Sequence, residues 1–219
     1  MRTLVAATLL GAFSAFALSN PSMAAPVPGN WTGAYLGVVG GPGSFVATFN
    51  NTLGNTTGDF NGSGLTGGGT AGFNWQMPGS PVVLGIEGDY SWANIMGTTS
   101  ASGCMPTCTL TLNWIATARG RIGVTAGSTL AYATAGAAFV GAHPTITGIP
   151  TTDFTDTGWT AGAGIEQLLH SGWSLKAEYL YSSFGQSPAF FSFNVNGPQT
   201  AYAGRLDVQQ FRVGVNKGF

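Results

Sequence analysis

WTAGAGIEQLLHSGWSLKAEYLYSSF, residues 159–184, contains two alternating runs on either side of the tripeptide His170-Ser171-Gly172. In each run every second residue is predominantly apolar, and the residues between are small, polar or charged. A period of two over runs of this length predicts two β-strands. A three-residue loop with Gly172 in the left-handed conformation predicts that they form a hairpin.

The side-chain phase predicts the register of this hairpin. A three-residue loop places Glu166 opposite Lys176 and Ala163 opposite Tyr179. A two-residue loop would place Glu166 opposite Leu175 and mix the two faces. We therefore expect one aromatic, apolar face and one face that carries a Glu166–Lys176 charge pair.

The composition excludes several classes of protein. Only 7 basic and 8 acidic residues are present, 7% of the chain, whereas soluble domains have roughly 25% charged residues. Disorder is excluded because 44% hydrophobic and 12% aromatic residues can bury a core. A net charge of −1 without a basic stripe excludes a nucleic-acid partner.

Residues 1–24 have the pattern of a secretory signal peptide. Arg2 precedes the apolar run from Leu4 to Leu18, and Ser22-Met23-Ala24 fits the small-x-small cleavage site. The run is shorter than the ~20 residues that a spanning helix needs. Residues 25–219 are therefore expected to form the exported domain.

Eight alternating runs follow, separated by long and short connections in turn. We predict strands over Trp31–Gly40, Leu65–Gln76, Val82–Trp92, Leu112–Val124, Thr129–Val140, Gly158–Leu169, Trp173–Phe184 and Asp207–Phe219. The long connections span about 16–24 residues, above the usual loop length. Bacterial outer-membrane barrels show the same asymmetry, with short periplasmic turns and long external loops. The pattern predicts an all-β, eight-stranded antiparallel up-and-down transmembrane β-barrel.

The tryptophans lie near the ends of these runs and suggest two belts. The short-turn end has Trp31, Trp75 and Trp173, and the long-loop end has Trp92, Trp114 and Trp159. Indole rings prefer the membrane–water interface. We therefore predict that these six residues are membrane-interface aromatics.

The charged residues within the runs oppose the apolar face. This set comprises Glu87, Asp89, Arg119, Arg121, Glu166, Lys176, Glu178 and Arg212. Charges on a lipid-facing surface would be costly, whereas inside a narrow barrel they can pair. A lipocalin-like soluble barrel with an apolar interior is the alternative fold, but low charge, two tryptophan belts and loop asymmetry favour the lipid-facing one.

Six segments carry a resemblance to a known family. They are WTGAYLGVVGG at Trp31, GGGTAGFNWQ at Gly67, LGIEGDYSW at Leu84, LNWIATARGRIGV at Leu112, GAGIEQLLHSGWSLKAEYLY at Gly162 and FRVGVNKGF at Phe211. Together they resemble the porin-family, OmpA-like β-barrel proteins of bacterial outer membranes, and specifically the outer-membrane immunogenic proteins. The resemblance covers essentially all of residues 25–219.

This resemblance implies a location in the bacterial outer membrane, among its lipids and lipopolysaccharide, and no enzymatic activity. Phe219 resembles the terminal aromatic residue that the barrel-assembly machinery recognises in this class. Some relatives are described as haemin binders or surface antigens. No haem motif matches here residue by residue, although His143 is a candidate ligand for haem iron.

Cys104 and Cys108 enclose three residues of the second long connection. Exported proteins reside in an oxidising compartment, so we predict a disulfide between them. A metal site is a poor alternative because no histidine lies nearby. His143 and His170 are interpreted as exposed polar residues, and no serine beside His143 supports a lipid-modifying enzyme.

The predicted function is structural and surface-contact: a rigid barrel, without a cofactor, displays four external loops to a partner that the sequence does not identify. A small passive diffusion channel is the first alternative, and a haemin-binding surface protein is the second. Ion conductance distinguishes the first alternative, and a haem spectrum distinguishes the second.

Overall fold

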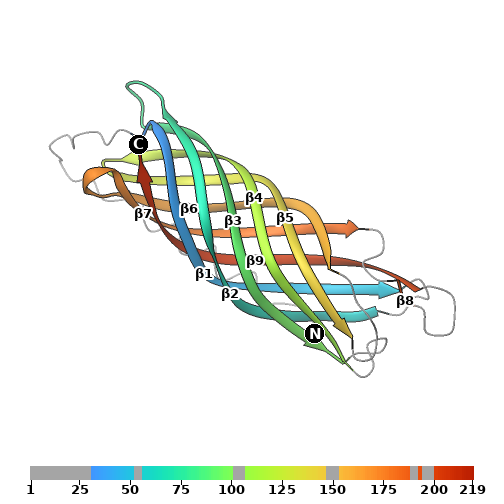
Figure 1. The fold of residues 1–219 in the computed structure, drawn as a ribbon. Coiled ribbons are helices and arrows are strands. Elements are labelled where there is room, and N and C mark those ends of the chain that lie inside the picture. Colours follow the sequence, from blue (N-terminus) through green and yellow to red (C-terminus); the bar gives the residue numbers. More distant parts are fainter. Residues whose placement is uncertain (1–30, 52–55, 101–106, 147–152, 188–191, 194–199) are drawn as a thin grey trace, which may run out of the picture.

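The computed structural model describes residues 31–51, 56–100, 107–146, 153–187, 192–193 and 200–219, and its strands close into a barrel (Figure 1). The barrel strands are β1 (Gly33–Asn51), β2 (Thr56–Gln76), β3 (Val82–Thr99), β4 (Cys108–Ala126), β5 (Thr129–Ile146), β6 (Phe154–Leu168), β7 (Trp173–Ser187) and β9 (Thr200–Gly218). A two-residue strand, β8 (Ser192–Phe193), pairs with β9 alone. Consecutive barrel strands pair antiparallel, and β9 pairs with β1 to close the sheet. The predicted eight-stranded up-and-down barrel is confirmed.

Three tight turns gather at one end of the barrel, the end where the chain reaches β9's last residue (Figure 1). They connect β2 to β3, β4 to β5 and β6 to β7. In the outer-membrane barrels such short turns face the periplasm. No helix in the described ranges has the length and apolarity needed to cross a membrane.

The hairpin of β6 and β7 has the register that its sequence predicts. Glu166 pairs with Lys176, and Ala163 pairs with Tyr179. Gly172 has a φ of 74°, as the three-residue loop requires. Ser171 also has a positive φ, 60°, which the pattern did not predict.

The strands are longer than predicted, chiefly at the end opposite the tight turns. β1 continues to Asn51 rather than Gly40, and β2 begins at Thr56 rather than Leu65. Their pairing continues as far as Asn50 and Thr56. The long connections expected between these strands are therefore largely strand, and only residues 52–55 separate β1 from β2.

The sense of the alternation reverses along β1, which explains why the predicted strand was too short. In β1 near the tight turns, Leu36 and Val38 point outward and are exposed, whereas farther along Phe45 and Ala47 point inward and are buried. The outward neighbour of Phe45, Ser44, is exposed and polar. Apolar-out suits a wall in lipid, and apolar-in suits a wall in water. The predicted strand therefore stopped where its apolar residues cease to face outward, although the strand itself continues.

A β-bulge at Asn113 shifts the phase of β4. Both Leu112 and Ile115 are fully buried, although their numbers differ in parity, and the pairing with β5 shifts between Leu112 and Trp114. An extra residue in one strand produces this shift. The bulge lets β4 keep apolar residues inside the barrel on one side of it and Arg119 inside on the other.

The outward face of β6 provides a direct test of the barrel's orientation. Ala163 lies on this face, opposite Tyr179 of β7 and Ala133 of β5. We expect Ala163→Arg to destabilise the barrel by about 2–4 kcal/mol, the cost of a cation near the bilayer midplane. Urea unfolding in lipid vesicles measures this change.

Ala163→Leu is the matched control, because leucine is also larger than alanine but carries no charge. Gly164→Ser is a poor control, since a Cβ atom at Gly164 would meet the ring of Tyr132 at 2.6 Å. Equal stability of the arginine and leucine variants would show that Ala163 does not face lipid.

Candidate functional site

Eight charged side chains meet inside the barrel. They come from five strands: Glu87 and Asp89 of β3, Arg119 and Arg121 of β4, Glu166 of β6, Lys176 and Glu178 of β7, and Arg212 of β9. All eight are buried. Neighbouring pairs on one strand are two residues apart because successive inward positions repeat every second residue.

Arg212 and Arg119 hold three of the carboxylates together. Arg212, with 0% of its surface exposed, pairs through Nη1 with Asp89 at 2.7 Å and through Nη2 with Glu178 at 2.6 Å. Arg119 contacts Asp89 at 2.9 Å, Glu178 at 3.0 Å and Glu87 at 2.5 Å. Asp89 and Glu178 therefore each have cationic partners from two different strands, β4 and β9.

Glu166 and Lys176 have separate partners, although they are neighbours in the sheet. Glu166 pairs with Arg121 at 2.8 Å and also accepts hydrogen bonds from Ser174 and Asn216. Lys176 reaches Glu87 at 2.8 Å. The expected Glu166–Lys176 ion pair is therefore wrong. In a narrow closed barrel, a long side chain can reach strands on the far wall as readily as its neighbour.

Two tyrosines that were not among the predicted site residues complete the charged cluster. The Tyr35 hydroxyl donates to Glu87 at 2.6 Å, and the Tyr132 hydroxyl donates to Glu178 at 3.3 Å. The Arg121 guanidinium lies 5.4 Å from the centre of the Tyr35 ring and 4.6 Å from that of Tyr132. The missed signal was phase: Tyr35 alternates with the outward-facing Leu36, so it had to point inward.

The cluster is electrically balanced. Its four carboxylates and four cations are joined by nine ion pairs within 4 Å, which link all eight groups in one network. Every carboxylate of this network has a cationic partner within it. Desolvation of a buried charge is costly unless partners compensate it, and here they do.

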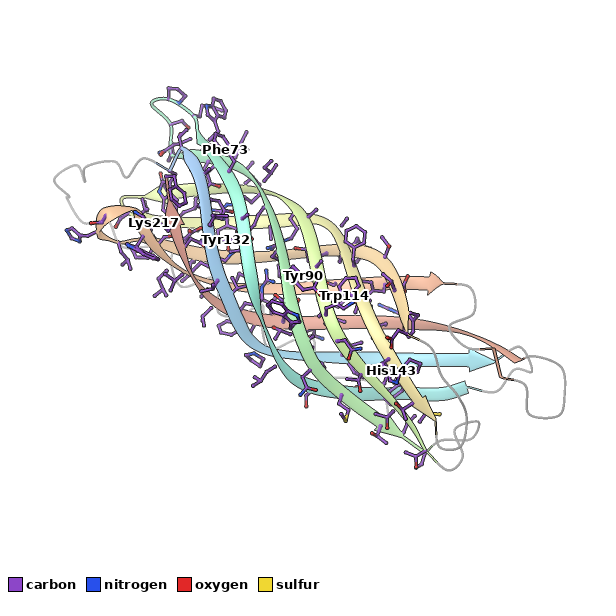
Figure 2. The ribbon with its side chains drawn as sticks, in the orientation of Figure 1. Phe73, Tyr90, Trp114, Tyr132, His143 and Lys217 are labelled. Carbon is purple, nitrogen blue, oxygen red and sulfur yellow. The ribbon has the colours of Figure 1, made fainter. Side chains whose placement is uncertain are left out.

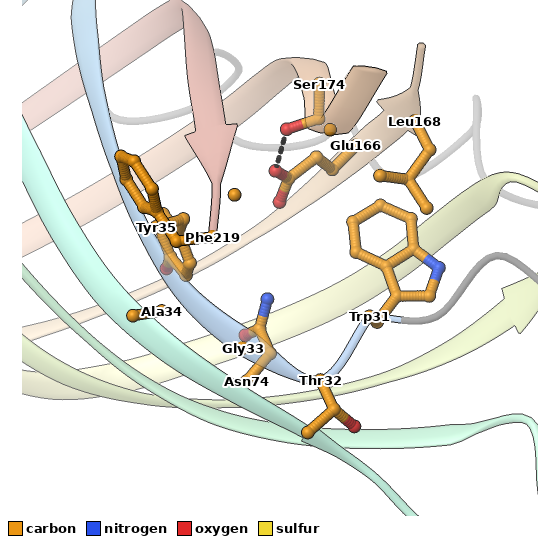
Figure 3. Close-up of a pocket in the computed structure, with 12 residues that line it drawn as sticks. Trp31, Thr32, Gly33, Ala34, Tyr35, Asn74, Glu166, Leu168, Ser174 and Phe219 are labelled. Atoms are coloured by element: carbon orange, nitrogen blue, oxygen red, sulfur yellow. Dashed lines mark hydrogen bonds between the residues drawn. The ribbon is translucent and has the colours of Figure 1, made fainter. Parts of the chain in front are cut away.

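A small pocket opens beneath the network at the tight-turn end (Figure 3). Its volume is about 230 Å³, and Tyr35, Asn74, Glu166 and Ser174 line it together with Trp31. Ser174 donates to Glu166 at its edge. The pocket opens the polar half of the lumen toward the tight-turn end.

Trp31 is not at the membrane interface, contrary to prediction. Only 5% of its surface is exposed, and it packs on Val83, Leu130 and Tyr132 inside the barrel. Trp31 has the same parity as the inward-facing Tyr35, so the alternation of β1, continued to residue 31, also points it inward. Its backbone N–H donates to the Gln76 side chain at 3.1 Å.

An apolar cluster fills the other half of the lumen. It contains Phe45, Ala47, Phe60, Ile95, Leu110, Leu112, Ile115, Ala138, Val140, Ala142, Phe184, Leu206 and Val208. Phe45 and Phe60 pack edge to face, with ring centres 5.8 Å apart. This cluster separates the charged network from the long-loop end.

The remaining predicted tryptophans all point away from the lumen. Trp75 and Trp173 are exposed toward the tight-turn end, and Trp92 and Trp159 are exposed farther along the barrel. Trp114 stacks on Tyr90, with ring centres 5.8 Å apart, and both lie on the outer wall (Figure 2). Their role as interface aromatics stays a prediction.

The other predicted residues lie apart from the lumen. Phe219 is exposed, and its N–H donates to the Ala34 carbonyl at 2.9 Å. Cys108 begins β4, but Cys104 lies outside the described residues, so their disulfide stays a prediction. The same holds for the signal peptide, residues 1–24.

The two histidines lie near opposite ends of the barrel. His170 is in the turn between β6 and β7, and His143 is on the outer wall of β5, where its Nδ1 lies 2.5 Å from an Asp153 oxygen (Figure 2). Within the described part of the chain, no three histidine, cysteine or acidic residues are grouped to hold a metal.

Comparison with known proteins identifies the family. Residues 4–219 match the family model described as the outer membrane protein beta-barrel domain. The chain belongs to this family. Its member in Brucella melitensis, the 31 kDa outer-membrane immunogenic protein, is 31% identical over 246 residues, which cover 100% of both chains. The 22 kDa outer membrane protein of Rhizobium leguminosarum is 30% identical over 156 residues, 71% of this chain and 65% of that protein.

A solved structure shows the same fold. The outer membrane protein OprG from Pseudomonas aeruginosa superposes with a TM-score of 0.53 at 10% sequence identity, covering 87% of this chain and 99% of that one. As a member of the outer-membrane β-barrel family, this protein resides in the bacterial outer membrane. The family therefore confirms the resemblance and the location that the sequence predicted.

Proposed function

We propose that this outer-membrane protein is a closed, non-enzymatic scaffold that displays its long-loop end to the exterior. One observation carries the proposal: the lumen is occupied along its length. Trp31 lies beside the small pocket at the tight-turn mouth, the eight paired charges occupy the middle, and the apolar cluster fills the outer half. An eight-stranded barrel has an interior just wide enough for side chains to fill it.

The apolar cluster argues most strongly against the channel alternative. Ions need water or polar groups along their whole path, and a packed apolar layer offers neither. Leu112, Ile115 and Phe184 all lie in this layer and are fully buried. The polar half of the lumen is therefore a vestibule that is closed toward the outside.

Planar-bilayer recording tests the scaffold. We expect the purified native protein to give little or no steady conductance, because no continuous polar path crosses the apolar cluster. A general porin inserted under identical conditions serves as the positive control. Large, stable single-channel steps from the native barrel would overturn the scaffold and establish the channel.

A further inference from the structure

A groove crosses the outer wall where the barrel closes, over β9, β1 and β2. Its volume is about 540 Å³. Small residues create it: Gly43, Ser44, Ser63 and Gly64 lie side by side on β1 and β2, as paired neighbours. Tyr179 of β7 forms one edge.

The outward side chains of the groove change from apolar to polar between successive outward positions on all three strands. Toward the tight-turn end, its outward side chains are Phe211 of β9, Pro42 of β1 and Leu65 of β2. Two residues farther from that end they are Gln209, Ser44 and Ser63. The apolar row is well exposed, with Leu65 at 68% and Phe211 at 52%. The groove therefore has an apolar half that continues the lipid-facing wall and a hydroxyl–amide half beyond it.

The groove also lies on the line of the outer aromatic side chains. The Trp159 and Tyr181 rings are 5.6 Å apart on β6 and β7. The row of paired residues that leads from Tyr181 passes through Gln209 to Ser44 and then to Ser63. No tryptophan or tyrosine occupies that row on β9, β1 or β2. The hollow therefore lies where the aromatic line is interrupted, at the border between apolar and polar wall.

We propose that this groove binds one outer-leaflet glycolipid at the junction of its acyl chains and its sugar headgroup. The acyl chains would lie against Leu65, Pro42 and Phe211. The sugar hydroxyls would hydrogen-bond to Ser44, Ser63 and the Gln209 amide, whose Oε1 already accepts from the Tyr179 hydroxyl at 3.0 Å. Lipopolysaccharide combines acyl chains with hydroxyl-rich sugars in the outer leaflet of the membrane in which the barrel resides, and the phosphates on its sugar headgroup would lie outside the uncharged groove.

Because the groove carries no charge, it is better suited to bind sugar hydroxyls than a phosphate group. None of the residues that line it is charged, whereas phosphate sites use arginine, lysine or exposed backbone N–H groups. Recognition should therefore depend on sugar hydroxyls and should change little with salt concentration. A phospholipid would fill the apolar half only.

Native mass spectrometry of the purified full barrel tests the proposal. The barrel is incubated in mild detergent with equal amounts of rough lipopolysaccharide and phosphatidylethanolamine, and retained lipid is counted. We expect a single retained lipopolysaccharide. Ser63→Trp, which fills the groove, should abolish its retention, whereas Thr145→Trp, on the exposed outer wall of β5, should leave it unchanged.

A second variant separates sugar recognition from apolar filling. Ser44→Ala combined with Ser63→Ala and Gln209→Leu keeps the hollow but removes its hydrogen-bonding groups. We expect the preference for lipopolysaccharide over phospholipid to fall about tenfold or more, because several neutral hydrogen bonds are lost. An altered gel mobility of the unboiled barrel identifies a variant that fails to fold. Equal retention of the two lipids by the native barrel, or unchanged retention by Ser63→Trp, would overturn the proposal.

Discussion

Arg212→Met is expected to lower the free energy of unfolding by about 3–5 kcal/mol, because it leaves the buried network with one more carboxylate than it has cations. Arg212 is fully buried and is the closest ion partner of both Asp89 and Glu178. Methionine preserves much of the side-chain volume, so the loss reports on charge rather than on a cavity. Urea titration of the refolded barrel in vesicles, followed by gel mobility without boiling, measures the change.

Arg205→Met is the matched control on the same strand. Arg205 pairs with Asp207 at 2.7 Å, but its side chain is 63% exposed. Exposed ion pairs contribute less than about 1 kcal/mol. We also expect Glu178→Gln to recover part of the stability lost in Arg212→Met, because it removes the uncompensated charge. Similar losses for Arg212→Met and Arg205→Met would show that water reaches and screens the network.

Phe45→Ala is expected to destabilise the barrel by about 3–5 kcal/mol, the usual cost of deleting a buried phenylalanine ring. The ring is buried beside Phe60 and lies over Gly62 and Gly97. A Cβ atom on either glycine would collide with it. These glycines offer no side chain to refill the space, and the ladder of paired strands prevents the wall from collapsing into it.

Phe73→Ala is the control for this second change. Phe73 also belongs to a barrel strand, but it faces outward near the tight turns (Figure 2). Lipid can fill the space that its ring leaves, so we expect a clearly smaller loss. If Phe45→Ala cost no more than Phe73→Ala, the outer half of the lumen would not be a packed core. Both variants can be measured by the same urea titration.

Together, the network and the apolar cluster give the barrel two kinds of interior. The half that lies within the membrane resembles a soluble protein turned inside out, with lipid around it and charges inside. The other half has the apolar interior and polar wall of a soluble barrel. With the apolar-out half in the membrane, the strands themselves, and not only the connections between them, extend beyond it.

Alternation in single strands was enough to predict much of this architecture. Glu166 and Ala163 have opposite faces because side chains alternate strictly along a strand. The phase of that hairpin correctly set Glu166 opposite Lys176, and the order of short and long connections indicated a closed up-and-down barrel. Each of these properties is local, so neighbouring residues along the chain are sufficient to encode it.

Contacts across the lumen were decided only by the tertiary structure. Lys176 reaches Glu87 instead of Glu166 because closing the sheet brings β3 within reach of β7, and no local pattern encodes the far wall. Trp31 shares the inward phase of Tyr35, but the apolar surface on which it packs is assembled by several strands only when the barrel closes. The upper strand segments were missed because their apolar residues face one another across a lumen that exists only once the barrel has closed. Periodicity determines which way a side chain points, whereas closure determines what it meets.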